Sequence, residues 1–397
     1  MPELILGDSL EVLIDHRGKT PKKLGGDFAF TGVPVVSAML VQDGKLRLGE
    51  ARYISEEMYR RWMPVRTKRN DVLLTSEAPL GRVALVQDDN PLALGQRLFG
   101  LRGKHGILNS VFLFYALQTD AVQGELLGRA TGTTVTGIRQ SELVKVRISA
   151  PSFTEQCTIA ALLRAIDDKI AINSKILWTS ADLMSLKYAH AIRSGVEVTS
   201  IGAIADVFDG PHATPEKTES GPWFLSISSL RNGRLALEES AHLAEPDFEK
   251  WTRRVTPMAG DVLFSYETRL GDAALMPKGV RACLGRRMAL MRPRDVGPRT
   301  LLQAFLSSSF QEIIKQYSVH GATVDRIPLS EFPSWRIDLP TKEPRQLEIA
   351  LRYLDEVAEQ RERENETLAV IRDTLLPKLM SGEIRVRDAQ KLAEQVT

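Results

Sequence analysis

The sequence predicts a mixed α/β fold with two similar globular domains, each followed by a long helix. Two observations support this fold class. The chain of 397 residues resembles itself at a spacing of about 190 positions, and a stretch with helical apolar periodicity follows each of the two similar parts. We expect the two helices to pack as an antiparallel coiled coil, with pseudo-two-fold symmetry between the halves.

The internal repeat preserves residue types in order. Asp71-Val72-Leu73-Leu74 matches Asp261-Val262-Leu263-Phe264, and Gly95-Gln96-Arg97-Leu98 matches Gly285-Arg286-Arg287-Met288. Further along, Ser141-Glu142-Leu143 matches Ser330-Glu331-Phe332. This period is far longer than that of a solenoid repeat, so each copy is a whole domain within a tandem repeat.

Local patterns then divide the chain. β-type runs at 33–37, 71–75 and 82–86 alternate with turn residues, whereas 108–118 and 299–317 have helical patterns. The helical stretches that follow the two copies have no internal Gly or Pro until Gly195 and Pro377, which predicts long uninterrupted helices. We therefore expect four segments: a globular domain at 1–150, a helix at 151–194, a second globular domain at 195–340, and a helix with a C-terminal tail at 341–397.

Composition excludes several classes of protein. Lys and Arg total 52 against 50 for Asp and Glu, and a formal net charge of +2 excludes a strongly basic nucleic-acid coat protein. The only cysteines, Cys157 and Cys283, lie far apart, which excludes a disulfide scaffold and favours the cytoplasm. No uncharged apolar run reaches about eighteen residues, so we expect neither a signal peptide nor a membrane span.

Catalytic signatures are also missing from the sequence. Gly18-Lys19-Thr20 resembles the end of a phosphate-binding loop, but Leu13 stands where that loop needs glycine. No Gly-x-Gly-x-x-Gly follows a strand-like run, and the six histidines show no helical metal-ligand spacing. We therefore expect no catalytic residues, metal or cofactor in this chain.

Several segments resemble the specificity subunit of type I restriction–modification systems. Pro151-Ser152-Phe153-Thr154-Glu155-Gln156 is similar to the start of that family's first long helix, and Leu375-Leu376-Pro377-Lys378-Leu379-Met380-Ser381-Gly382-Glu383-Ile384 to the end of its second. Leu6-Gly7 and Ile201-Gly202 resemble the entries to its two target-recognition domains. The resemblance covers nearly the whole chain.

The resemblance implies a DNA-binding subunit that is not itself an enzyme. Each target-recognition domain would read one half of a bipartite target in double-stranded DNA. Two methyltransferase (modification) subunits would dock on the chain for DNA methylation, and two restriction/translocase subunits would complete the restriction system. S-adenosylmethionine, ATP and Mg would then belong to the partner subunits. Two other functions stay open: a DNA-modifying enzyme, as a fused methyltransferase or nuclease, and a duplicated scaffold with no role on DNA.

Base recognition needs side chains with directional hydrogen bonds, such as Arg for guanine and Gln for adenine. Basic clusters at 58–70 and 273–294 are candidates for contact with DNA phosphates. At matching loop positions of the two copies we predict these DNA-binding residues: Arg17, Lys19, Thr20, Ser76, Arg82, Gln96, Arg97, Thr133 and Thr134 in the first, and His212, Thr214, Tyr266, Arg269, Arg286, Arg287 and Thr323 in the second.

The helices would act as a spacer between the two half-sites. At about 1.5 Å per residue, the helical pattern from Thr154 to Ala189 would span roughly 54 Å. At about 3.4 Å per base pair, that length gives an upper limit of about 16 base pairs. The polar residues Asn173, Arg361 and Asn365 interrupt the apolar seam.

Overall fold

The computed structural model describes residues 1–16, 18–42, 44–132, 134–319 and 324–389. The chain divides into two compact units, the first formed by Met1–Ile172 with Glu364–Thr397 and the second by Asn173–Arg363. The predicted fold class is confirmed, because each unit is mixed α/β and two long helices, α6 (Phe153–Ser194) and α11 (Pro344–Ser381), pack together. The border between the units falls near the middle of each long helix, so about half of α6 and half of α11 belong to each unit.

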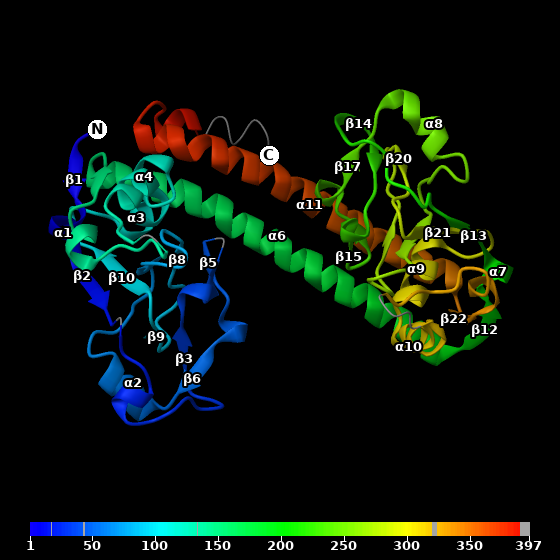
Figure 1. Cartoon of the computed structure of the whole chain (residues 1–397), viewed down its shortest axis with the longest axis horizontal. Helices are drawn as coiled ribbons and strands as arrows, with labels where there is room; N and C mark the ends of the chain where they lie inside the picture. The colour runs from blue at the N-terminus through cyan, green and yellow to red at the C-terminus, as the bar shows by residue number, and fades with distance from the viewer. Residues whose placement is uncertain (17, 43, 133, 320–323, 390–397) are drawn as a thin grey trace. The chain divides into compact units, whose positions relative to one another are not determined.

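The first unit is built on an antiparallel four-stranded sheet in the order β2-β10-β7-β8. A three-stranded sheet, β6-β3-β9, and the β4-β5 hairpin accompany it, and β1 pairs with β11 where the chain enters and leaves the domain (Figure 1). The strands are β1 (Glu3–Ile5), β2 (Leu10–Asp15), β3 (Val33–Val36), β4 (Val41–Gln42), β5 (Lys45–Leu46), β6 (Arg52–Ile54), β7 (Val72–Thr75), β8 (Val83–Leu85), β9 (Ala93–Leu94), β10 (Leu98–Gly103) and β11 (Arg147–Ser149). The helices are α1 (Leu6–Ser9), α2 (Glu56–Trp62), α3 (Ser110–Ala116), α4 (Asp120–Gly128) and α5 (Gln140–Leu143).

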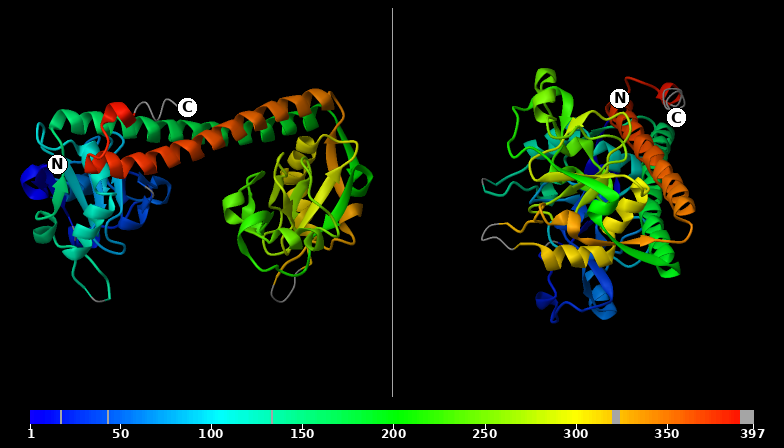
Figure 2. Two further views of the ribbon diagram at one scale, coloured as in Figure 1. Left: turned by 90° about the horizontal axis from the view of Figure 1, so that it is seen from above. Right: turned by 90° about the vertical axis from the view of Figure 1, so that its right-hand side faces the viewer.

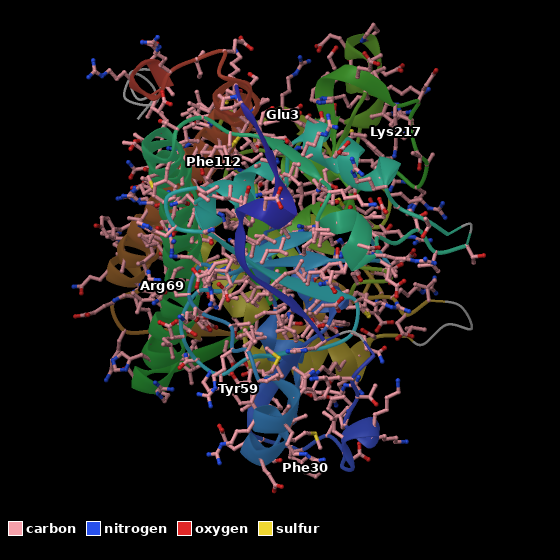
Figure 3. All side chains as sticks on the ribbon, turned by 90° about the vertical axis from the view of Figure 1, so that its left-hand side faces the viewer. Glu3, Phe30, Tyr59, Arg69, Phe112 and Lys217 are labelled. Atoms are coloured by element: carbon pink, nitrogen blue, oxygen red, sulfur yellow. The ribbon has the colours of Figure 1, made fainter. Side chains whose placement is uncertain are left out.

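Both faces of this sheet are covered, which explains the continuous apolar run of β7. Val72 and Leu74 point into a core shared with α3, α4 and the two long helices, whereas Leu73 points into a second core with α2, β3 and β9. Figure 3 shows Phe112 of the first core and Tyr59 of the second in different parts of the unit. The β-type runs predicted from the sequence form β3, β7 and β8.

The second unit repeats the topology strand for strand. Its main sheet has the order β13-β21-β18-β19, and β17-β14-β20 reproduces the three-stranded sheet, including its one parallel pairing. The strands are β12 (Val196–Ser200), β13 (Ala205–Asp209), β14 (Thr218–Phe224), β15 (Leu230–Arg231), β16 (Arg234–Leu235), β17 (Ala241–His242), β18 (Val262–Ser265), β19 (Ala273–Leu275), β20 (Ala282–Cys283), β21 (Met288–Pro293) and β22 (Arg336–Pro340). The helices are α7 (Ile201–Ile204), α8 (Phe248–Trp251), α9 (Pro298–Leu306) and α10 (Ser308–Tyr317).

The long helices run antiparallel where they meet. In the first unit, Lys169 Nζ lies 3.0 Å from Glu364 Oε1, and Arg372 Nη1 donates to Asp167 Oδ1 at 3.0 Å. In the second unit, the end of α6 shares a buried apolar core with the start of α11 (Figure 2). Asn173, predicted to interrupt the apolar seam, is fully buried.

Two helix predictions need correction. The stretch 299–317 is not one helix but two, α9 and α10, because the chain becomes extended at Ser307, whose hydroxyl accepts a hydrogen bond from the Phe310 amide and caps α10. The helix predicted at 108–118 is shorter, since α3 ends at Ala116, and α4 follows it. Among the described helices, none is long and apolar enough to cross a membrane.

Candidate nucleic-acid interface

Four strand ends of the first unit's main sheet meet at one edge. β2 and β7 end there, at Asp15 and Thr75, while β10 and β8 begin there, at Leu98 and Val83. A further loop joins this edge because the Ile138 amide donates to a carbonyl of the loop after β7 at 2.9 Å. We call these loops the first loop edge, made of the described residues within 16–21, 76–82, 95–97 and 131–138.

The residues predicted for the first half gather on this edge although they come from four separate segments. Antiparallel pairing explains the gathering, since the end of one strand lies beside the start of the next. The structure places these predicted residues on the first loop edge: Lys19, Thr20, Ser76, Arg82, Gln96, Arg97 and Thr134. Arg17 and Thr133 lie outside the described residues.

The second unit has the equivalent edge, formed where β13 and β18 end and β21 and β19 begin. The Ile327 amide donates to the Tyr266 carbonyl at 2.8 Å, the counterpart of the bond made by Ile138. We call it the second loop edge, made of the described residues within 210–215, 266–272, 285–287 and 319–327. It carries these predicted residues: His212, Thr214, Tyr266, Arg269, Arg286 and Arg287. Thr323 lies outside the described residues.

Not all of these side chains face outward. Ser76 and Tyr266, which occupy equivalent positions, are 1% and 6% exposed, and burial raises the pKa of Tyr266. Because they point inward in this structure, these two side chains do not line the exposed surface of the loop edges. The exposed predicted residues are Arg82, Gln96, Arg97, Thr134, His212, Thr214, Arg269 and Arg286.

Other predicted residues are partly engaged within the protein. Lys19 Nζ donates to the Trp62 carbonyl at 2.9 Å, which connects the loop after β2 to the end of α2. In the second unit, His212 Nε2 lies 3.3 Å from Asp209 Oδ2. These contacts fix the directions of the two loops and leave fewer side chains free to bind another molecule.

An ion pair crosses each loop edge at the same position. Arg97 Nε lies 3.0 Å from Glu77 Oε1, and Arg287 Nε lies 3.2 Å from Glu267 Oε2. Both arginines have left-handed backbone conformations, with φ of 65° and 73°. Sequence reasoning singled out the two arginines but missed the two glutamates, although the glutamates also recur about 190 positions apart.

A glutamine holds the turn between β7 and β8. Gln123 Nε2 donates to the Gly81 carbonyl at 2.9 Å and to the Leu117 carbonyl at 2.5 Å. In the second unit, Gln311 Nε2 donates in the same way to the carbonyls of Gly271 and Phe305. Gly81 has a φ of 93°, and the glutamine side chain occupies the space that a Cβ would need. The turn that carries part of the loop edge is therefore fixed from α4.

We expect Gln123→Ala to destabilise the first unit by about 1–2 kcal/mol, because it leaves two carbonyls without their donor. Hydrogen exchange of the β7 and β8 amides checks this, with the β18 and β19 amides of the same molecule as the internal reference. Gln123→Glu is the matched control for shape, and its carboxylate cannot donate. Exchange in β7 and β8 that both variants leave unchanged would contradict the role given to Gln123.

The basic clusters seen in the sequence are divided by the fold. Arg66 and Arg69 lie just before β7 begins, which is the end of the sheet away from the first loop edge. In the second unit, Arg292 is likewise bound at the far end of β21 by Asp261, whereas Arg286 and Arg287 lie on the loop edge. The arginines of each cluster therefore do not all lie on a loop edge, and contact of these clusters with DNA phosphates stays a prediction.

The described residues contain no group of three or more His, Cys, Asp or Glu side chains that could hold a metal ion. The two loop edges are the regions where polar and basic side chains from separate segments converge. Guanidinium, amide and hydroxyl groups on exposed loops suit hydrogen bonding to base edges and phosphates. Contact of these residues with DNA stays a prediction.

The chain is similar in sequence to known proteins. The family model described as "Type I restriction modification DNA specificity domain" matches residues 5–178. The chain is 24% identical over 346 residues to the type I restriction enzyme MjaIX specificity subunit of Methanocaldococcus jannaschii, covering 81% of this chain and 79% of the relative. It is 27% identical over 154 residues to the MjaVIII specificity subunit of the same organism, covering 38% and 36%.

A solved structure has the same fold. The crystal structure of the type I restriction–modification S subunit from M. genitalium superposes with a TM-score of 0.63 at 17% identity, covering 95% of each chain. Together with the sequence relatives, this similarity confirms the resemblance that the sequence motifs predicted.

Proposed function

We propose that this chain, a type I restriction–modification specificity subunit, reads a bipartite DNA target with one loop edge for each half-site. The observation that carries the proposal is the pair of loop edges, which share one framework but differ in their exposed side chains. Gln96 in the first stands where Arg286 stands in the second, and these residue types suit adenine and guanine respectively. Two different half-sites can therefore be read by two copies of one domain.

The chain supplies recognition and leaves the chemistry to partners. We propose that two methyltransferase subunits and two restriction/translocase subunits assemble with it in the cytoplasm. S-adenosylmethionine, ATP and Mg would be bound by those subunits. Methylation of adenine requires the base to leave the helical stack, which is a step for the methyltransferase pocket.

The two long helices would set the gap between the half-sites and offer a surface for docking of the methyltransferase subunits. α6 has 42 residues, so at about 1.5 Å per residue it spans roughly 63 Å. An unread gap between two short half-sites follows from this arrangement. The gap would contribute to specificity only through its length.

We expect cells that carry the system to show one methylated bipartite motif, which methylome sequencing detects. The purified chain with its methyltransferase partners should then bind that motif at least about a thousandfold more tightly than random duplex. Scrambling either half-site alone should remove the preference. These results require both loop edges to read DNA.

The two alternatives predict other outcomes. Tight S-adenosylmethionine binding by the chain without partners would favour a fused methyltransferase, and cleavage of DNA by the chain alone would favour a nuclease. Equal binding to all duplexes in the presence of the partners would favour a scaffold without a role in DNA recognition.

A further inference from the structure

The two loop edges share some residues and differ in others. The shared residues are the ion-paired Glu77 and Arg97, matched by Glu267 and Arg287. The Leu-Gly turn after β7 also recurs, with φ of 93° at Gly81 and of 85° at its counterpart Gly271. Side chains that both units share in similar conformations do not explain how the units would read two different half-sites.

The shared arginines also contact other residues of the protein. Arg97 connects two loops of the first loop edge. Its carbonyl accepts a hydrogen bond from the Ser76 amide at 2.9 Å, and its guanidinium forms the ion pair with Glu77. In the second unit, Arg287 binds Glu267 and also donates to the Thr268 hydroxyl at 3.0 Å. Through these contacts the two guanidinium groups help to hold the loops in place.

The residue just before β8 and β19 reverses its charge between the units. Arg82 in the first unit is exposed, and its guanidinium has no ion-pair partner among the described residues. Asp272 occupies this position in the second unit, where Arg269 Nη2 binds it at 2.5 Å. At this position the first unit therefore has an exposed positive charge, whereas the second has a carboxylate paired with Arg269.

The opposite difference occurs just before β10 and β21. Gln96 is neutral and exposed in the first unit. Its counterpart Arg286 is exposed, and no described residue forms an ion pair with its guanidinium. Among the described residues of 76–82 and 95–97 in the first unit, and of 266–272 and 285–287 in the second, the arginines without an ion-pair partner are Arg82 and Arg286. They occupy different positions in the two units.

We propose that Arg82 and Arg286 are the guanine-reading side chains of the two half-sites, and that Arg97 and Arg287 are positioning residues. An uncommitted guanidinium can donate two hydrogen bonds to O6 and N7 of guanine in the major groove. A guanidinium already bound to a carboxylate has fewer donors to offer. This assignment rests on the proposed function and divides the predicted arginines into two roles.

The test uses the complex with methyltransferase partners and measures base preference at every position of both half-sites. Arg82→Ala should lower discrimination for guanine about tenfold to a hundredfold at one position of one half-site. Arg286→Ala should do the same in the other half-site only. In each case the untouched half-site reports that the variant is folded and assembled.

Arg97→Ala should weaken binding to every target sequence without changing which base is preferred. Arg97→Lys, which can keep the ion pair with Glu77, should restore most of that binding. The matched control is Arg147→Ala, an exposed arginine of β11 paired with Glu3, and it should change neither binding nor preference.

Two failures are distinguishable. If the wild-type complex has no bipartite motif, the proposed function is wrong. If the motif exists but Arg82→Ala and Arg286→Ala leave every base preference intact, only this assignment is overturned. Loss of one base preference in Arg97→Ala would also overturn it, because Arg97 would then read a base itself.

Discussion

Adding four residues to both long helices, between Ile172 and Asn173 and between Arg363 and Glu364, is expected to widen the unread gap by one or two base pairs. Four residues lengthen a helix by about 6 Å, and they also advance it by about 40° beyond a full turn. One or two base pairs at about 3.4 Å each match that length, and one base pair rotates the duplex by about 35°. The measurement is the methylated motif of cells carrying the lengthened subunit.

These insertion points preserve the contacts inside each unit. The first unit ends at Ile172 and resumes at Glu364, so both insertions lie on the border between the units. The ion pair of Lys169 with Glu364 stays within the first unit and is retained. Both half-site sequences should therefore stay as they were, and only the gap should change.

A single insertion is the control. It lengthens one helix alone, so the two helices can no longer keep the same register in both units. We expect loss of binding to the original motif and to the widened one. A motif whose gap stays constant when both helices are lengthened contradicts the role of the helices as a spacer.

The repeat made most of the architecture predictable. Apolar runs such as 71–75 predicted strands correctly because both faces of the sheet are buried, and the helical periodicity identified α6 and α11. The break between α9 and α10 was missed because the apolar periodicity continues across Ser307, where only the local backbone conformation changes.

The candidate site was predictable in position but not in detail. Corresponding loop positions in a repeat identified residues that antiparallel pairing brings to one edge. Burial of Ser76 could not be foreseen, since a polar residue after a strand is usually exposed. The partners of Arg97 and Arg269 also depend on side-chain directions that a single sequence does not contain.

A second pair of charged residues recurs at the other end of each main sheet, and it was also missed. Arg102 donates from Nε and Nη2 to the two Asp71 carboxylate oxygens at 2.7 and 2.8 Å, and the Lys68 amide donates to Asp71 at 2.8 Å. Arg292 and Asp261 repeat this two-bond geometry in the second unit, at 2.9 and 2.8 Å. The hydrogen bonds that the two guanidinium groups donate to these carboxylates raise the pKa of both arginines.

We expect Asp71→Ala to destabilise the first unit by about 3 kcal/mol, because Asp71 is 1% exposed and its loss removes both close carboxylate contacts of the Arg102 side chain, which is 13% exposed. Arg102 would keep only its bond to the Arg66 carbonyl and the more distant Glu11, at 4.0 Å. Asp261→Ala should have a similar or smaller effect on the second unit, since Arg292 is more exposed than Arg102. Hydrogen exchange of β7 and β10 against β18 and β21 in the same molecule measures the two effects separately. Each variant should weaken recognition of its own half-site first.

The matched control removes an acid of the same unit that pairs with arginine at the surface. Glu3 and Arg147 lie 3.5 Å apart with both side chains about 60% exposed, so Glu3→Gln should cost well under 1 kcal/mol. If Asp71→Ala proves as mild as this control, solvent must reach the Arg102 pair freely. The aspartate and arginine would then recur in both halves for a reason other than stability, and their position away from the loop edges would need a different explanation.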